Sequence, residues 1–302
     1  VCEEGLGDLR GTKHVFRTGG AHVSDFSKQY PWKDHYDGFV SIDDKNTAGI
    51  IYQAVGSQRY QVTFHGLGGH SYTGFGIPNP VHAMGRAIAK ISDFQVPANP
   101  KATFSVGVVN GGTSVNVIAA EASMLVDMRS VDSKALADLS AKFHQAIEEA
   151  VLEENARWGY ETQEAVVNVT SNTTSNATSG RNIDPETPRI YATIEQKGKR
   201  PAGIQSQDCQ IVQAAAAADW AIGMEPLYIG AASTDANIPI SLGIPAITIG
   251  WGGKGGGEHT VHEWYEQVES WKGPQRDLLL ILALAGYQEF RKYQLGNKKN
   301  TD

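Results

Sequence analysis

Residues 57–91, SQRYQVTFHGLGGHSYTGFGIPNPVHAMGRAIAKI, place a strand pattern directly before a helix pattern. Three apolar residues alternate with polar neighbours, as in a strand with one buried face: Tyr60, Val62 and Phe64. Asn79-Pro80 then supplies an N-cap and a first-turn proline. Four apolar residues follow at helical spacing: Val81, Met84, Ile88 and Ile91. The stretch therefore predicts a strand followed by an amphipathic helix.

The downstream sequence continues this alternation of strands and helices. Two strands are predicted over 102–109 and 122–129, a long helix begins after Asp132-Ser133, and a last strand covers 190–194. The order strand–helix–strand–strand–helix–strand is typical of a ferredoxin-like unit. We therefore expect an inserted domain over 57–199. Within it, the polar segment at about 168–187 predicts a disordered loop.

The flanking segments predict a second domain of mixed α/β type. A strand ends at residues 41–44, an alanine-rich helix covers 209–220, and a buried strand covers 244–249. A glycine-rich loop follows, and Gly273-Pro274 precedes a last amphipathic helix. We expect residues 1–56 and 200–302 to form one mixed-sheet domain, which gives an α/β (α+β) fold interrupted by the ferredoxin-like unit.

Composition limits the class of protein. The chain has 302 residues, 41% hydrophobic and 20% charged, which is typical of a globular protein with a packed core. A net charge of −7 argues against nucleic-acid binding, which usually requires a basic surface. The longest apolar run, 278–286, has about half the length that a membrane span requires. We therefore expect neither nucleic acid nor membrane as a partner.

The sequence leaves two alternatives for the cellular compartment. Two cysteines, Cys2 and Cys209, are too few for a disulfide framework and favour a cytoplasmic protein. Three N-glycosylation sequons point instead to secretion, the alternative that we keep; they begin at Asn168, Asn172 and Asn176.

Eight motifs follow one another in an order that resembles the M20 family of zinc peptidases and N-acyl-amino-acid hydrolases. They are EEGLGDLRG (3–11), SIDD (41–44), GLGGHS (66–71), NVIA (116–119), DMRS (127–130), KRPAG (199–203), STDAN (233–237) and GGEHTVHEW (256–264). The resemblance covers nearly the whole chain. It implies that residues 1–56 and 200–302 form a zinc-hydrolase catalytic domain and that residues 57–199 form a lid and dimerisation domain.

The resemblance also implies a metal site and a general base. Glu4, Asp43 and His259 match metal ligands of the family, and Glu3 matches the base that deprotonates the attacking water. Asp37 is the alternative to Asp43, and His262 is the alternative to His259.

Further motif residues match the family's substrate contacts. His70 resembles a catalytic lid histidine that each subunit presents to its partner's active site, where it stabilises an oxyanion. Asn116 resembles a second lid donor, and Arg129 a clamp for a substrate carboxylate, although Arg129 could instead pair with Asp127 or Glu121. Arg200 either orients substrate or closes the domain junction. Three residues line the substrate in the family: Ser233, Thr234 and Asn237; we expect Asp235 to shape their turn.

The family pattern includes a His-x-Asp motif and a bridging aspartate upstream of Glu3. Neither precedes Glu3 in this sequence, so we expect a fragment truncated at its N-terminus, which binds one zinc or none and does not turn over substrate. The full-length family site holds two zinc ions.

We expect the full-length protein to be a zinc-dependent hydrolase of amide bonds in short peptides or N-acyl amino acids, and a homodimer through its lid domain. The alternative is an inactive, dimerising M20-like pseudoenzyme without a complete dinuclear site. A second alternative, a deacetylase of an amino-acid intermediate, differs only in its acyl pocket.

Overall fold

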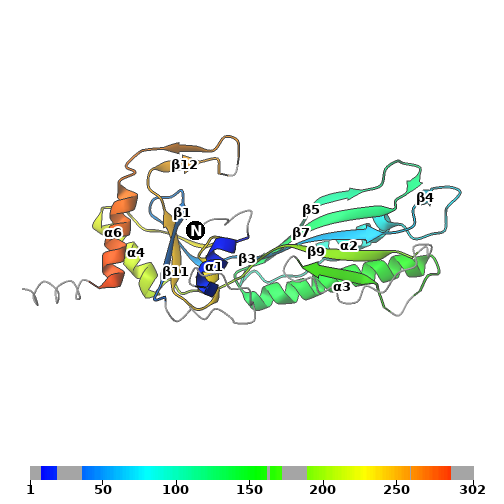
Figure 1. Ribbon diagram of the computed structural model, residues 1–302, viewed down its shortest axis with the longest axis horizontal. Helices are drawn as coiled ribbons and strands as arrows, with labels where there is room; N and C mark the ends of the chain where they lie inside the picture. The colour runs from blue at the N-terminus through cyan, green and yellow to red at the C-terminus, as the bar shows by residue number, and fades with distance from the viewer. Residues whose placement is uncertain (1–7, 19–35, 162–163, 172–188, 259, 287–302) are drawn as a thin grey trace, which may run out of the picture. The chain divides into compact units, whose positions relative to one another are not determined.

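The computed structural model describes residues 8–18, 36–161, 164–171, 189–258 and 260–286, and the chain divides into two compact units (Figure 1). One unit contains Val1–Val55 and Gly203–Asp302, and the other contains Gly56–Ala202. The second unit is thus inserted in the sequence of the first.

The inserted unit is built on a sheet of five strands in the order β5-β7-β3-β9-β8. Its elements are β3 (Gly56–His65), β4 (Gly69–His70), α2 (Pro80–Ser92), β5 (Ala102–Gly111), β6 (Val117–Ile118), β7 (Glu121–Ser130), α3 (Ser133–Arg157), β8 (Val167–Ser171) and β9 (Tyr191–Arg200). Strands β5, β7, β3 and β9 pair antiparallel with one another in this order, which is that of a ferredoxin-like unit. The predicted fold class is confirmed.

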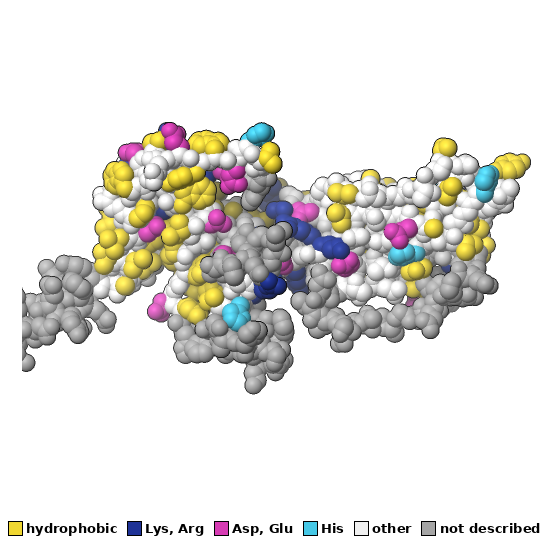
Figure 2. All heavy atoms as spheres, turned by 45° about the horizontal axis from the view of Figure 1, so that its top comes forward, with side chains coloured by type: hydrophobic (Ala, Val, Ile, Leu, Met, Phe, Trp, Pro, Cys, Tyr) yellow, Lys and Arg dark blue, Asp and Glu magenta, His cyan; other side chains and the backbone are white. Residues whose placement is uncertain are grey.

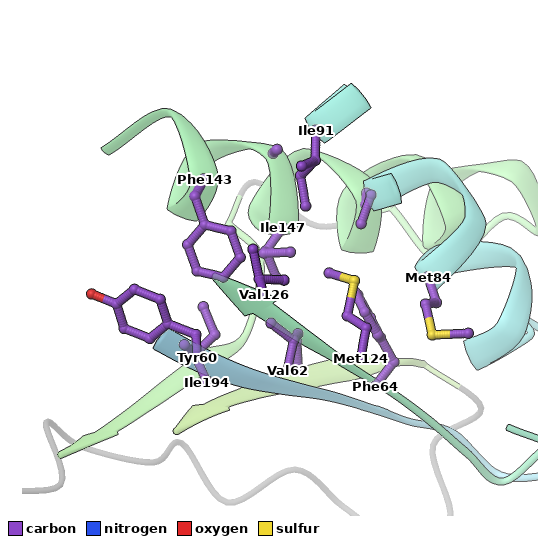
Figure 3. Close-up of a cluster of buried hydrophobic side chains, with 14 of the residues drawn as sticks. Tyr60, Val62, Phe64, Met84, Ile91, Met124, Val126, Phe143, Ile147 and Ile194 are labelled. Carbon is purple, nitrogen blue, oxygen red and sulfur yellow. The ribbon is translucent and has the colours of Figure 1, made fainter. Parts of the chain in front are cut away.

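Helices α2 and α3 cover one face of this sheet (Figure 3). Tyr60, Val62 and Phe64, the alternating residues of the first predicted strand, point into the core between sheet and helices. The Asn79 side chain accepts the backbone N–H of Val81 at the start of α2, as the N-cap pattern predicted. Asp132 caps α3 in the same way.

The prediction of a loop over about 168–187 was wrong for the first residues of that segment. Val167–Ser171 form β8, which pairs in parallel with β9 at the edge of the sheet. Val167, Val169 and Thr170 are β-branched residues, which favour a strand even among polar neighbours. The remainder of the predicted loop, residues 172–187, lies outside the described residues.

The other unit is built on a mixed sheet of four strands in the order β1-β11-β2-β10. Its elements are α1 (Arg10–Thr18), β1 (Phe39–Asp44), β2 (Gly49–Ala54), α4 (Gln210–Ala221), β10 (Leu227–Ala232), α5 (Asn237–Ser241), β11 (Ala246–Gly250), β12 (Lys254–Gly256), β13 (Trp264–Glu266) and α6 (Lys272–Ala285). Strand β1 runs parallel to β11, and β2 runs parallel to β10 but antiparallel to β11.

Each face of the mixed sheet is covered by a different pair of helices. Helices α4 and α6 lie side by side and bury Ile247 and Ile249 of β11 together with Leu280 (Figure 1). On the other face, Phe16 of α1 packs against Ile238 of α5 in a smaller apolar cluster. All five residues of β11 are buried, which agrees with a strand covered on both faces.

Several elements of this unit were not expected from the sequence. Helix α1 and the strands β2 and β10 were not predicted. Within the described part of the chain, none of the helices combines the length and the apolar character that crossing a membrane requires.

Candidate functional site

The carboxyl ends of the parallel strands β1 and β11 meet at one edge of the mixed sheet. Ile42 of β1 pairs with Ile249 of β11, and Asp44 pairs with Gly250. Asp43 is the extra residue of a β-bulge between these two pairs. The carboxyl edge of parallel strands is where α/β proteins usually bind ligands. Glu3, Glu4 and His259, the other residues predicted for the metal site, lie outside the described residues.

Three contacts join the loops that leave β1 and β11 at this edge. Lys45 Nζ lies 3.0 Å from Glu258 Oε2, the residue directly before His259. The backbone N–H of Trp251 donates to the Asp44 carbonyl at 3.0 Å. The Thr47 hydroxyl donates to the carbonyl of Gly253 at 3.0 Å. The chain thus brings the segment of Asp43 close to the segment that leads into His259.

Asp44 itself belongs to the turn between β1 and β2. Its Oδ1 atom accepts the backbone N–H of Asn46 at 3.4 Å and the side-chain amide of Asn46 at 3.3 Å. Burial raises the pKa of Asp44, and these hydrogen bonds oppose the shift. A Cβ atom on Gly49 would overlap Asp44 Oδ2, so Gly49 leaves room for the carboxylate. Asp44 therefore has a structural role in this turn.

The two alternatives to the predicted ligands differ in their position. Asp37 precedes the start of β1, at the opposite end of that strand from Asp43 and from the loop of Glu258. It is therefore poorly placed to share a cation with that loop. His262 is exposed, and its backbone N–H donates to the Thr260 hydroxyl at 3.1 Å in the turn that follows residue 259.

The turn after β10 holds the predicted substrate residues of this unit. Thr234 and Asn237 are buried, and the Thr234 N–H donates to Asn237 Oδ1 at 2.9 Å. The Thr234 and Thr248 hydroxyls are 2.7 Å apart. Ser233 is half-buried in the same turn. The polar atoms of Thr234 and Asn237 thus hold the shape of the turn.

Helix α1, which begins six residues after Glu4, is anchored to this turn. The hydroxyl of Thr12, a fully buried residue, donates to the carboxylate of Asp235, which is also buried. The bond gives Asp235 a partner on α1, and its role in shaping the turn stays a prediction. The bond also connects the start of the chain to the β10–α5 turn.

In the inserted unit, His70 and Asn116 lie together beyond one end of the sheet. His70 of β4 pairs with Val117 of β6, and the Asn116 carbonyl accepts the N–H of Ser71 at 3.0 Å. Both residues are exposed. The His70 Nδ1 atom accepts the backbone N–H of Tyr72 at 3.2 Å, so the neutral imidazole carries its proton on Nε2.

Arg129 and Arg200 lie at the opposite end of the same sheet. Arg129 of β7 pairs with Ser57 on one side of β3, and Arg200 of β9 pairs with Ser57 on the other side. Arg129 Nε lies 2.7 Å from Asp127 Oδ2, which is the alternative pairing considered from the sequence. Arg200 is buried. Other Lys and Arg side chains also lie beside Asp and Glu side chains on the face drawn in Figure 2, as Arg129 lies beside Asp127.

The length of β3 separates these two pairs of residues. Ser57 and His65 are eight residues apart in this strand, about 26 Å at about 3.3 Å per residue. His70 lies farther along the chain, in the loop region that Gly66 ties to Ala120 through a 2.9 Å hydrogen bond. Within one chain, His70 and Arg129 therefore cannot contact the same small molecule.

A pocket of about 610 Å³ lies at the end of the sheet where His70 is found. It is lined by Leu67–Gly69, Asn110–Thr113 and Val117–Ser123, with Glu121 as its ionisable residue. Neither His70 nor Asn116 lines it. Its lining gives no indication of the predicted chemistry.

The described residues contain no group of three or more His, Cys, Asp and Glu side chains arranged to hold a metal ion. Glu4 and His259 are outside this set, so the search does not include the predicted ligands. Two carboxylates and an imidazole are a donor set that suits zinc. The contacts between the β1 and β11 loops, which bring Asp43 near the segment before His259, fit such a site.

Comparison with known proteins agrees with the sequence motifs. Residues 52–155 match the M20_dimer family model, the peptidase dimerisation domain. No curated protein matches the chain in sequence.

Solved structures share the fold over most of the chain. A tripeptidase from Staphylococcus aureus is 16% identical with a TM-score of 0.65, over 93% of this chain and 62% of its own. The aminopeptidase PepT from Bacillus cereus is 16% identical with a TM-score of 0.63, over 84% and 59%. The YxeP protein of Bacillus subtilis, a dinuclear metal binding peptidase from the M20 family, is 15% identical with a TM-score of 0.58, over 93% and 62%. The chain thus spans about three fifths of their length.

The fold defines the class: a mixed α/β domain interrupted by a ferredoxin-like unit, which the M20 peptidase dimerisation model matches over residues 52–155. The chain shares its fold with solved peptidases, one of which is described as a member of the M20 family. The resemblance seen in the sequence motifs is confirmed.

Sequence reasoning missed three residues that shape the candidate site: Thr12, Lys45 and Arg276. Thr12 and Lys45 contact residues more than 200 positions away, and no local pattern predicts such contacts. Arg276 gave no clear local signal, because it lies in the polar first part of α6 beside Gln275 and Asp277.

Proposed function

We propose that the whole protein is a metal-dependent hydrolase that cleaves amide bonds in short peptides or N-acyl amino acids, and that it acts as a homodimer. The M20 dimerisation domain and the shared fold support the class of reaction. The contacts that bring the Asp43 segment and the Glu258 segment together support a site at the carboxyl edge of β1 and β11.

Zinc held by Glu4, Asp43 and His259 would supply Lewis-acid chemistry, polarising the scissile carbonyl and making water more acidic. Glu3 takes a proton from the attacking water and later delivers it to the leaving amine. Arg129 binds a substrate carboxylate with its guanidinium group, and Arg200 orients the substrate beside it. Ser233, Thr234 and Asn237 contribute a substrate-facing turn.

His70 is the donor for the oxyanion in this proposal. Its Nδ1 atom accepts from the backbone, so Nε2–H is available to an outside acceptor. Asn116, next to it, provides a second donor through its side-chain amide.

The distance between His70 and Arg129 is the observation that supports a homodimer. The two residues lie about 26 Å or more apart along β3, whereas a dipeptide spans about 7 Å. If both contact one substrate, they come from different subunits. A symmetric dimer places the His70 of each subunit at the site of the other.

Mixed dimers test this arrangement. Glu3→Gln and His70→Ala homodimers should both be inactive. When the two variants are denatured and refolded together, half of the dimers are mixed, and one of the two sites in each mixed dimer has both Glu3 and His70. Activity on a panel of dipeptides and N-acyl amino acids should then return to about a quarter of the wild-type value.

Failure to recover activity in the refolded mixture would remove His70 from the partner's site. A wild-type protein that binds no zinc and hydrolyses none of the panel would favour the non-catalytic dimerising protein instead. Equal rates for wild type and Glu3→Gln would remove Glu3 from the mechanism.

A further inference from the structure

Arg276 is a fully buried arginine at the edge of the mixed sheet where β1 and β11 end. One guanidinium nitrogen, Nη1, donates to the carbonyl of Thr47 at 3.0 Å, and the other, Nη2, donates to the carbonyl of Gly250. Thr47 belongs to the loop after β1, and Gly250 is the last residue of β11. A single side chain thus holds both loops that lead from the candidate metal site.

Two carboxylates balance the buried charge of Arg276. Its Nε atom donates to Asp277 Oδ1 at 2.7 Å, and Nη1 lies 3.5 Å from Asp219 Oδ1 on α4. Asp219 is fully buried, and its Oδ2 atom has no hydrogen-bond partner. A buried ion pair of this kind contributes little stability compared with apolar packing, so its presence calls for another explanation.

The backbone of α6 is shaped to bring Arg276 to this place. A Cβ atom on Gly273, in the first turn of the helix, would lie 2.5 Å from the Trp251 carbonyl oxygen. Glycine therefore lets the helix start directly against the chain that follows β11. Arg276 lies three residues later, so its side chain points back along the helix toward the Gly250 carbonyl.

From this geometry we infer that Arg276 is a positioning residue, which keeps the loop of Asp43 and the loop leading to His259 in register by holding the Thr47 and Gly250 carbonyls. Its importance for catalysis rests on the proposed function, but its effect on the loops does not. The fixed fork of the guanidinium group can hold two carbonyls at once, which a lysine ammonium cannot do in the same geometry.

Hydrogen exchange tests the inference without any metal or substrate. Two amides report on the loops: Gly49 N–H, bonded to the Asn46 carbonyl at 2.7 Å, and Trp251 N–H, bonded to Asp44 at 3.0 Å. In Arg276→Lys, peptides over 44–50 and 250–256 should exchange about tenfold faster or more, while peptides over α4 keep wild-type rates. The matched control is Leu280→Ala, because Leu280 is buried in the same helix but packs in the apolar cluster of Ile247 and Ile249 and does not bind the Thr47 and Gly250 carbonyls.

Wild-type exchange of both loops in a folded Arg276→Lys protein would overturn the inference. If Arg276→Lys does not fold, the double variant Arg276→Met with Asp219→Asn removes the guanidinium together with its fully buried partner and takes its place in the same experiment. Faster exchange in Leu280→Ala, confined to the same two loops, would also contradict a specific role for Arg276.

Zinc affinity connects the loops to the proposed site. In isothermal titration of the whole protein, Arg276→Lys should bind zinc about tenfold or more weakly than wild type, as found for residues that orient metal ligands, and Leu280→Ala should bind as wild type. Faster loop exchange together with unchanged zinc affinity would refute the positioning of the metal site. If the wild type binds no zinc, the proposed function fails, and the exchange result still decides whether Arg276 holds the loops.

Discussion

The Nζ atom of Lys45 lies 3.0 Å from Oε2 of Glu258, although 213 positions separate the two residues. Lys45 follows Asp43 by two residues, and Glu258 directly precedes His259. The pair therefore reports whether the two segments of the candidate metal site meet in the folded protein. Lys45 is about half-exposed, so the pair is expected to contribute modestly to stability.

A double-mutant cycle measures this pair directly. Using Lys45→Met and Glu258→Gln, we expect a coupling free energy of about 0.3–1 kcal/mol at low salt that decreases as salt is added. Lys272 and Glu269, an ion pair elsewhere in the same unit at 2.8 Å, form the matched control cycle. Additive effects at low salt for Lys45 and Glu258 would show that the two loops do not meet.

Asp219 predicts a dependence of stability on pH. Burial raises the pKa of Asp219 to about 6, from its ordinary value of 3.8, against the opposing charge of Arg276. Because the folded-state pKa is above the unfolded one, the folded protein binds this proton more tightly, and the contribution to stability is lost as pH rises from about 4 to 6. The full shift corresponds to about 3 kcal/mol, of which about 2 kcal/mol is lost between pH 4 and 6.

The measurement is urea unfolding from pH 4 to 6, followed by tryptophan fluorescence. Relative to wild type, Asp219→Asn should gain about 2 kcal/mol across this window as the wild type loses its contribution. Glu149→Gln is a control of opposite sign, because hydrogen bonds from Lys90 and Gln145 lower the pKa of Glu149. The loss of stability caused by Glu149→Gln should become smaller at lower pH. It should be small throughout, since the pair of Lys90 and Glu149 is partly exposed. A constant difference between Asp219→Asn and wild type would contradict the prediction.

Much of the fold followed from the sequence because periodic apolar residues decide which face of an element is buried. Tyr60, Val62 and Phe64 predicted β3 and its buried face, and the Asn79 cap located the start of α2. In contrast, β2 and β10 were missed. The β10 sequence LYIGAA has no alternation and is mostly exposed, so its place in the sheet depends on pairing with β2, which a local pattern cannot reveal.

The candidate site also has a part that the sequence predicts and a part that it does not. Motifs identified Asp43, His70 and Arg129 as candidate site residues. The distance between His70 and Arg129, however, follows only from the register of β3 with β7. Likewise, Lys45 and Arg276 act through contacts with residues far away in the chain. Local patterns predict residue types, whereas long-range pairing decides which of them meet.

Thr12 provides a test of how α1 is held. Its hydroxyl donates to the buried Asp235 carboxylate, and removal of a donor to a buried charged acceptor typically costs about 1.5–3 kcal/mol. Thr12→Val, which keeps the shape, should therefore lower the free energy of unfolding by that amount. Thr12→Ser retains the hydroxyl and should lose less than half as much. Equal losses in chemical denaturation would assign the effect to the missing methyl contacts instead.

Glu154 connects the two helices of the inserted unit and gives the sharpest stability test there. It is fully buried; its Oε1 atom accepts the Asn79 N–H at 3.1 Å and the Trp158 indole at 3.0 Å, and Oε2 accepts from Arg86 at 3.0 Å. Glu154→Ala leaves these donors without their acceptor, so we expect a loss of about 3 kcal/mol or more in the free energy of unfolding.

The neighbouring residue is a matched control for Glu154. Glu153 is half-exposed and pairs with Lys90 at 2.8 Å, so Glu153→Ala should change stability by about 1 kcal/mol or less. Glu154→Gln keeps one carbonyl acceptor and should lie between the two. Thermal unfolding of the inserted unit, monitored by the fluorescence of Trp158, orders the three variants. A Glu154→Ala protein as stable as Glu153→Ala would mean that the buried carboxylate does not hold α2 to α3.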